Sequence, residues 1–432
     1  MHWLIGVAQA DVTPREPLWL GGYGGRSRPA DGILHPLRTA ALALTDAAGR
    51  RGVFISSDQM GFAPETVRQI QDALHRELGL SPADIFLTAS HNHCGPVLSG
   101  ALIDYYGMTA DEWAAVDRYT RVYVEVVVRL AQEAFNHAKP GELLSGEGRA
   151  EFAVNRRNNR ETEVPALREE GRPLLGPTDH SVPVLAARST AGDWMAIAYG
   201  YACHPTVLSD YHWCGDYPGF AALAMESEFP GVVPMFWTGC GGDQNPLPRR
   251  TVELCRSYGE ELAKSVRSTV GAGLERIEPE LRTAYHRVEL PFEHTLAPSE
   301  FEPHLNSPNS IRRRWSRRWR QRLLEGMRVP GSVEYPVRVW RLGKRQLWIG
   351  LGAEAVVDYS LRFRREYGPH TWICGYSDEM LGYIPSRRVW EEGGYEGGFL
   401  FEYGHPAERW RGDVEDRISA GVAGLVDAVF QE

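Results

Sequence analysis

Two histidines separated by one residue, His91 and His93, follow a short apolar run over 85–89. Side chains two positions apart in an extended strand point to the same side, so both imidazoles are expected together at a strand terminus. Such a pair suits either a metal ion or acid–base catalysis. The alternative interpretation is that both are ordinary polar residues of a loop.

A third histidine, His204, follows a second apolar run over 194–201. Ligands of open α/β sheets collect beyond the ends of strands. We therefore expect His204 to lie near His91 and His93, although it belongs to a separate part of the chain. His204 has two interpretations, a metal ligand or a core histidine that is hydrogen-bonded to the backbone.

A glycine-rich segment, Gly239–Gly242, follows a third apolar run over 232–237 and leads into Asp243. Small residues after a buried strand let backbone N–H groups turn towards a ligand, which predicts an anion or oxyanion cradle. The segment is not a Walker A loop, because no Gly-Lys-Ser/Thr follows the glycines. Asp243 has two interpretations: it orients a ligand histidine, or it closes an Asx turn.

Two later residues, Glu354 and Tyr395, are candidate oxygen ligands for the same metal ion. Glu354 lies just beyond the apolar run over 346–351, and Tyr395 is flanked by glycines. Two histidines and a carboxylate form a known catalytic zinc set that leaves a position open for water. Glu354 is alternatively a carboxylate at a helix N-terminus, where the helix dipole favours it.

The elements that must position these residues alternate between strand-like and helical segments. This order predicts an α/β fold with a central mixed, largely buried sheet flanked by helices. Residues 1–432 are expected to form one catalytic domain with a helical excursion at about 295–330. Strands are expected at the N-terminus and at 37–45, 53–57, 85–89, 182–187, 194–201, 232–237, 337–342 and 346–351, and helices at 64–78, 110–138, 218–228, 250–269, 310–326 and 355–367.

The amino-acid composition bears on which partners the protein can bind and in which cellular compartment it is expected. Lys and Arg total 47 against 56 for Asp and Glu, giving a net charge of −9, which argues against nucleic-acid binding. No apolar run is long enough to span a bilayer, and the N-terminus lacks the basic region of a signal peptide, so a cytoplasmic protein is expected. The six cysteines lack disulfide spacing and are expected to be free thiols.

The segment Arg312–Arg320 departs from the acidic trend, with Trp315 and Trp319 one helical turn apart. A basic aromatic helix is able to make peripheral contact with a membrane surface or an anionic partner. The favoured interpretation is a surface helix whose two tryptophans pack on the protein.

An ordered set of short motifs resembles the N-terminal catalytic domain of the neutral/alkaline, non-lysosomal ceramidase family. The set spans almost the whole chain, and its order is far more specific than any one member. The motifs are Ala10–Pro14, Gly22–Arg26, Ser57-Asp58, Ser90–Pro96, Asn155-Arg156, His204–Thr206, Gly215–Gly219, Gly242–Pro246, Glu354 and Gly394–Glu396.

The resemblance implies a zinc-dependent hydrolase of lipid metabolism. In the family, Zn²⁺ is held by two histidines, a glutamate and a tyrosine, and zinc-bound water attacks the amide carbonyl of a small-molecule N-acyl substrate. The implied ligands here are His91, His204, Glu354 and Tyr395. The resemblance also places His93 and Arg156 beside the metal, and Tyr395 is alternatively a phenol donor to the oxyanion.

Departures from the family keep other functions open. The family carries serine in a Gly-Asp-x-Ser-Pro motif, whereas this chain has Asn245, which offers only an amide beside Asp243. We also expect no counterpart in residues 1–432 of the family's C-terminal immunoglobulin-like domain. The alternatives are an esterase or deacylase of a soluble N-acyl or O-acyl metabolite, and a non-catalytic metal-binding scaffold.

Overall fold

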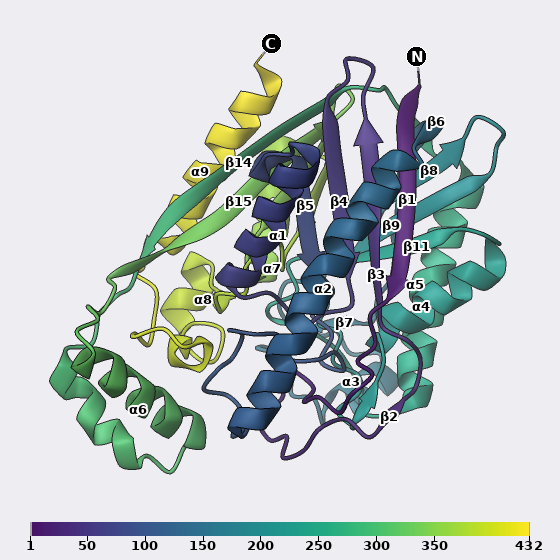
Figure 1. Cartoon of the computed structure of the whole chain (residues 1–432). Helices are drawn as coiled ribbons and strands as arrows, with labels where there is room; N and C mark the ends of the chain where they lie inside the picture. The colour runs from purple at the N-terminus through teal and green to yellow at the C-terminus, as the bar shows by residue number, and fades with distance from the viewer. Residues whose placement is uncertain (1, 432) are drawn as a thin grey trace.

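The computed structural model describes residues 2–431, which form two β-sheets with helices on the outer side of each sheet (Figure 1). The larger sheet has nine strands in the order β11-β9-β8-β6-β1-β3-β4-β5, with β13 paired to β6. Its strands are β1 (Trp3–Asp11), β3 (Arg38–Thr45), β4 (Arg51–Ser57), β5 (Ile85–Ala89), β6 (Lys139–Arg149), β8 (Ser181–Ser189), β9 (Trp194–Tyr201), β11 (Val233–Thr238) and β13 (Glu275–Ile277).

The second sheet has the strand order β14-β15-β16-β18. The fold also contains three separate two-stranded ladders. Its strands are β14 (Leu281–Pro291), β15 (Ser332–Leu342), β16 (Gln346–Leu351) and β18 (Thr371–Cys374). The ladders pair β2 (Gly32–Ile33) with β10 (His212–Trp213), β7 (Ala153–Asn155) with β12 (Gln244–Pro246), and β17 (Glu354–Ala355) with β19 (Tyr383–Ile384).

Aromatic side chains fill the space between the two sheets. The Trp348 ring, from the second sheet, lies 4.6 Å from Phe54 and 4.7 Å from Trp237 of the larger sheet, measured between ring centroids. All three rings are fully buried. Rings of this size remove a large apolar area from water, so this layer is a principal source of stability.

Helices cover the two outer faces. α1, α2, α4 and α5 pack on the larger sheet, and α7 and α9 pack on the second one. The helices are α1 (Pro64–Leu78), α2 (Ala110–Asn136), α3 (Val164–Glu169), α4 (Asp216–Glu228), α5 (Val252–Ala272), α6 (Ser310–Leu324), α7 (Val357–Tyr367), α8 (Arg387–Glu392) and α9 (Val414–Phe430), with short 3₁₀ turns at Pro82–Asp84, Pro298–Asn306 and Leu400–Tyr403.

This architecture confirms the predicted α/β class with a mixed central sheet flanked by helices. Three long elements, β6, β14 and α9, were not predicted, and neither were several short ones such as β18, α3 and α8. β6 contains three glycines and two glutamates, so it lacks the apolar alternation that marks a strand. It is a strand because β1, β8 and β13 all pair with it.

The edges of the larger sheet come together. In the strand order β11 and β5 lie at opposite ends. Nevertheless, Ser56 of β4 donates a hydrogen bond to the Phe236 carbonyl of β11 at 2.6 Å. Thr238, the last residue of β11, donates to the Ser90 carbonyl after β5, also at 2.6 Å. The segments that follow β5 and β11 are therefore neighbours in space.

α6 forms the helical excursion at one side of the molecule (Figure 1). Trp315 and Trp319 are buried, and their indole N–H groups donate to the carbonyls of His405 at 2.7 Å and Gly404 at 3.0 Å. The Arg318 guanidinium pairs with Asp104. The two tryptophans thus pack on the protein itself, as the favoured interpretation predicted.

The remaining expectations concern thiols and membranes. All six cysteines are free and buried, as predicted. Within residues 2–431, no helix combines the length and apolar character required to cross a bilayer.

Candidate functional site

Three histidines from two separate segments meet in the interior. His91 and His93 follow β5, and His204 follows β9. One ring nitrogen from each histidine lies within 4.8 Å of the others, and the side chains are at most 9% exposed. The predicted convergence is confirmed, and these three residues are able to hold a metal ion.

Backbone carbonyls fix the orientation of two imidazoles. The His91 Nδ1–H donates to the Met60 carbonyl at 2.7 Å, and the His204 Nδ1–H donates to the Gly241 carbonyl at 2.6 Å. Each ring therefore turns its Nε2 lone pair inward. This is the usual way in which proteins hold a metal-binding histidine in one tautomer.

Glu354 lies between these imidazoles and is 1% exposed. Its Oε2 lies 3.0 Å from the His204 Nε2 and 3.2 Å from the His91 Nε2. Its Oε1 accepts a hydrogen bond from the Tyr403 hydroxyl. Glu354 belongs to β17 and precedes α7 by three residues, so its carboxylate points at the histidines rather than capping the helix.

Burial and charge set the protonation of these groups. Burial alone would raise the pKa of Glu354, but His91 and His204 hold that pKa well below its usual value. Burial, helped by the positive charge of Arg156, lowers the pKa of His204 to about 4. The site therefore offers an ionised carboxylate and a neutral imidazole, which are the forms that bind metal.

His93 lies directly beside His91. The two Nε2 atoms are 3.2 Å apart. The opposite nitrogen of His93, Nδ1, is buried and has no hydrogen-bond partner among the described residues. The Tyr23 ring packs edge-on against the His93 ring at 4.8 Å, and a Cβ added to Gly22 would lie 2.2 Å from Nδ1. Burial lowers the pKa of His93 well below its usual value.

Tyr403 and Tyr383 both lie beside Glu354, and the predicted Tyr395 lies next to Tyr383, with 5.1 Å between their ring centroids. Tyr395 is 39% exposed, and its hydroxyl donates to Glu402 at 3.3 Å. Tyr383 is 5% exposed and faces Glu354 across the β17–β19 ladder. Its ring lies 6.3 Å from the His204 ring. Tyr395 as a metal ligand stays a prediction, whereas the burial of Tyr383 next to Glu354 follows from strand pairing. A single glycine before Tyr383 was the only local signal.

Arg156 reaches the site through the β7–β12 ladder. β7 ends at Asn155, whose register partner is Gln244, and the next residue, Arg156, donates its backbone N–H to the Asp243 carbonyl at 2.9 Å. Its guanidinium donates to Glu396 at 2.7 Å, to Tyr383 at 2.9 Å and to the Asn245 side-chain oxygen at 3.3 Å. The prediction that Arg156 and Asn245 belong to one site agrees with this geometry.

The contacts of Asp243 match neither of its two interpretations. Its buried carboxylate accepts hydrogen bonds from the Asn155 amide at 2.9 Å, the Gln244 amide at 3.0 Å and the Val357 backbone N–H at 2.9 Å. It therefore joins β7, β12 and the start of α7. The backbone carbonyl of Gly241, rather than Asp243, orients His204.

The glycine segment is packed closely rather than open as a cradle. The N–H of Gly242 donates to the Ala355 carbonyl at 2.9 Å, and the N–H of Gly241 donates to the Gly239 carbonyl at 2.7 Å. A Cβ at Gly242 would lie 2.6 Å from the Glu354 carbonyl oxygen. Glycine is needed here so that the strand bearing Glu354 can approach, which corrects the prediction of an anion cradle.

Left-handed backbone accumulates around the centre. His91 has a φ of 58°, Tyr376 has 54°, and Ala353, which precedes Glu354, has 61°. The Tyr376 ring lies 4.4 Å from the His91 ring. Each such non-glycine residue costs conformational energy that the surrounding packing must supply, and this pattern is typical of functional sites.

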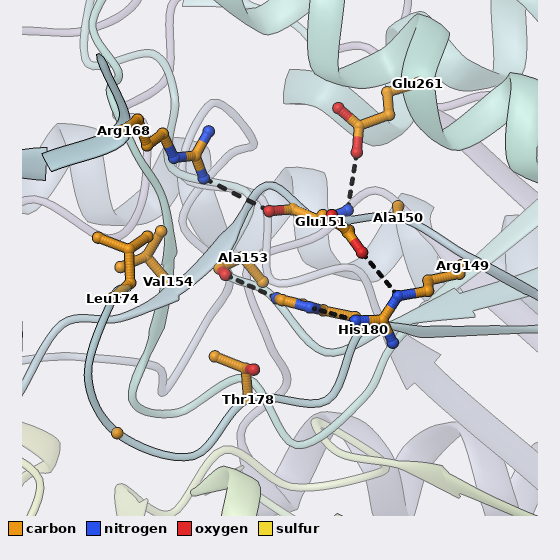
Figure 2. Close-up of a pocket in the computed structure, with 11 residues that line it drawn as sticks. Arg149, Ala150, Glu151, Ala153, Val154, Arg168, Leu174, Thr178, His180 and Glu261 are labelled. Atoms are coloured by element: carbon orange, nitrogen blue, oxygen red, sulfur yellow. Dashed lines mark hydrogen bonds and ion pairs between the residues drawn. The ribbon is translucent and has the colours of Figure 1, made fainter. Parts of the chain in front are cut away.

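A separate surface cavity of about 700 Å³ lies at the end of β6 (Figure 2). Its polar groups are largely paired with one another. Arg149 binds Glu151 at 2.8 Å, and the His180 Nε2 lies 3.0 Å from the Ala153 carbonyl oxygen. None of the predicted site residues lines this cavity, so the candidate active site is the histidine cluster.

The N-terminal half of the chain matches a known protein family. A family model described as "Neutral/alkaline non-lysosomal ceramidase, N-terminal" matches residues 3–239. A rice protein (Oryza sativa subsp. japonica), "Neutral ceramidase", is 23% identical over 149 residues, which cover 34% of this chain and 19% of the rice protein. The chain therefore matches about a fifth of the length of that relative.

Two solved structures share the fold. The neutral ceramidase from Pseudomonas aeruginosa matches with a TM-score of 0.75 at 19% identity, over 100% of this chain and 74% of that one. A structure described as "Ceramidase complexed with C2" matches with a TM-score of 0.75 at 17% identity, over 100% of this chain and 75% of that one. Both matches support the α/β architecture described above.

Proposed function

This chain belongs to the neutral/alkaline non-lysosomal ceramidase family, and from that premise we propose that it is a metal-dependent hydrolase of an amide bond in an N-acyl substrate. One observation carries the proposal: the Nε2 atoms of His91 and His204 both point at a single oxygen of Glu354, at 3.2 Å and 3.0 Å. Three buried ligand atoms that approach so closely are best satisfied by a shared cation.

The donor set fits a catalytic zinc ion. His91, His204 and Glu354 provide two imidazoles and one carboxylate, and the buried phenol of Tyr383 lies beside them. Zn²⁺ bound there would lower the pKa of a water ligand to about 7 and polarise a substrate carbonyl. The carbonyls of Met60 and Gly241 would keep both imidazoles in the required tautomer.

Arg156 is suited to hold a substrate oxygen. Its guanidinium remains charged at all relevant pH values, and its contacts to Glu396, Tyr383 and Asn245 fix its plane. A fixed positive group that faces a carbonyl stabilises the negative charge that develops on the oxygen during hydrolysis. Asn245 accepts from Arg156 through its oxygen, so its amide N–H groups are directed elsewhere and are suited to donate to substrate.

His93 is suited to move a proton. Its Nε2 lies within 3.2 Å of the His91 Nε2, and its pKa is held low by burial, so the ring is neutral at pH 7. A neutral imidazole beside the reacting atoms takes a proton from the attacking water and returns it to the leaving nitrogen. The same groups also serve an O-acyl substrate, in which the leaving atom is oxygen.

The test combines metal content with turnover. We expect the purified protein to contain about one equivalent of a divalent metal by mass spectrometry and to hydrolyse N-acyl compounds, with loss of activity on chelation and recovery with Zn²⁺. His91→Ala and His204→Ala should lose both metal and activity. The matched control is His137→Ala, at the exposed end of α2, which should keep both.

Two outcomes contradict parts of the proposal. Stoichiometric metal with no turnover of any N-acyl or O-acyl compound would indicate a metal-binding scaffold. Metal and activity retained in both His91→Ala and His204→Ala would place the centre elsewhere.

A further inference from the structure

A polar cavity of about 860 Å³ opens beside the candidate active site. Arg156, Asn245 and Tyr395 form part of its wall, so it adjoins the groups that would hold a substrate. Four arginines, three glutamates and three asparagines line it, and among the described lining residues Leu247 alone is aliphatic. A long aliphatic chain gains little from such a surface, because pockets for apolar ligands are lined mainly by apolar side chains.

The carboxylates of this cavity are already engaged by arginines. Glu396 accepts from Arg156 at 2.7 Å and from Arg157 at 2.6 Å. Glu161 accepts from Arg249 at 2.7 Å and also lies 3.9 Å from Arg250. Arg157 also binds Glu392, and Arg160 lies 3.4 Å from Glu163. With Arg250 and Glu392 counted beside the lining, five arginines face four glutamates, which leaves an excess of one positive charge around the cavity.

A further positive charge lies near His93. Arg26 is 7% exposed, and none of its three guanidinium nitrogens has a hydrogen-bond acceptor among residues 2–431. Its guanidinium lies 5.2 Å from the centre of the Tyr23 ring, and the Arg250 guanidinium lies 5.5 Å from the same ring. A positive region thus extends from the cavity past Tyr23 to His93, in a chain whose net charge is −9.

We propose that this cavity binds an anionic group of the substrate, so that the enzyme acts on N-acyl compounds that carry a carboxylate or a sulfonate close to the amide. The inference rests on the proposed amide hydrolysis. Guanidinium groups bind carboxylate and other oxyanions through charge-assisted hydrogen bonds. The short polar part of the substrate would lie against Arg249 and Arg160, with the amide carbonyl at Arg156.

The test uses three lauroyl amides that differ only in the amine: N-lauroylglycine, N-lauroyltaurine and N-lauroylethanolamine. The first two carry a carboxylate or a sulfonate, and the third is neutral. With the metal-loaded full chain, we expect kcat/KM for the anionic amides to exceed that for the neutral one by about tenfold. The preference should fall at high ionic strength, because salt screens partly exposed charges.

Two substitutions at one ion pair should act in opposite directions. Arg249→Gln should reduce the ratio of anionic to neutral kcat/KM roughly three- to tenfold, and Glu161→Gln should increase it by a similar factor. Arg249→Lys should keep most of the preference. Local damage to the fold would change kcat/KM for all three substrates by a similar factor. The ratio of anionic to neutral kcat/KM therefore reports the effect of the charge alone. The matched control is Arg68→Gln, whose arginine is 66% exposed on α1.

Each result of these measurements either supports the proposed anion site or overturns it. Equal rates for the three amides, a preference for the neutral one, or shifts of the same sign in Arg249→Gln and Glu161→Gln would overturn it while leaving amide hydrolysis in place. If no amide is hydrolysed, the proposed function fails. Calorimetric binding of N-lauroylglycine and N-lauroylethanolamine to the metal-loaded protein and both variants then tests the anion site separately, with opposite shifts supporting it and equal affinities overturning it.

Discussion

Glu354 and Tyr383 face each other as register partners in the two-stranded parallel ladder of β17 and β19. Glu354 contacts both His91 and His204, and Tyr383 accepts a hydrogen bond from Arg156 at 2.9 Å. The ladder therefore connects the groups that would hold a metal with the group that would hold a substrate oxygen. Its two strands are separated by α7 and β18 along the chain.

Removing the Tyr383 hydroxyl should impair turnover more than removing the one on Tyr395. Tyr383→Phe leaves one Arg156 N–H without its acceptor and removes a phenol beside Glu354, so we expect kcat to fall roughly 10- to 100-fold. Tyr395→Phe, at the exposed rim, should cost less than about threefold. Kinetics on N-lauroylethanolamine with parallel metal analysis check this, and equal losses in both variants would contradict the assignment.

Neutralising Glu354 should weaken metal binding. Glu354→Gln keeps the side-chain shape but removes the ionised carboxylate between His91 and His204, so the apparent metal Kd should rise by roughly 100-fold or more. Competition with a chromogenic chelator measures it. Glu402→Gln is the control, because that carboxylate is also largely buried but binds Tyr395. Comparable loss of metal in the control would show that any carboxylate change in this region disturbs the site.

A methyl group at Gly22 should displace His93 while leaving the metal ligands in place. The added Cβ would lie 2.2 Å from the His93 Nδ1, at a φ of +88°. Gly22→Ala should therefore lower the free energy of unfolding by about 1–3 kcal/mol and reduce kcat, with metal content retained. Gly25→Ala has open space around its Cβ and should be nearly neutral. Full activity in Gly22→Ala would exclude a proton-transfer role for His93.

The stability of the fold should depend on the titration of Asp216. Burial raises the pKa of Asp216 from 3.8 to about 6. The backbone N–H groups of Leu208, Tyr217 and Val207 donate hydrogen bonds to its carboxylate and partly offset this rise. Because the folded state binds the proton more tightly, stability from this group is complete below pH 4 and is lost as pH rises towards 6, amounting to about 3 kcal/mol.

Asp216→Asn isolates this effect. Asparagine tolerates the φ of 53° at this position, and it does not ionise. The stability of the variant relative to the native protein should therefore rise between pH 4 and pH 7, measured by urea unfolding at each pH. A difference that stays constant over this range would show that Asp216 is not titrating there.

The tryptophans of α6 should contribute to stability rather than to membrane contact. Trp315 is fully buried against Phe301 and Phe401, so Trp315→Ala should destabilise the protein by about 3–5 kcal/mol. Arg317→Gln, on the exposed side of the same helix, should have little effect. Thermal unfolding together with sedimentation on anionic vesicles checks both statements. Vesicle binding that disappears in Trp315→Ala at a temperature where the variant is folded would contradict this assignment.

Local sequence determined the chemistry available to this protein. His91, His93 and His204 could be identified because each follows an apolar run, and the end of a strand is where side chains leave the sheet. Glu354 was identified in the same way. The packing of Trp315 followed from the spacing of the two tryptophans, since residues four apart share one face of a helix.

Tertiary structure decided which of these groups meet. The approach of β11 to β5 depends on contacts such as Thr238 to Ser90, and periodicity along a chain carries no information on which distant strands become neighbours. The placement of Tyr383 beside Glu354 depends on pairing between β17 and β19. Asp243 anchors three elements because they surround it. Sequence patterns report the face of a strand or helix, whereas the identity of the neighbour across that face is set by packing of the whole chain.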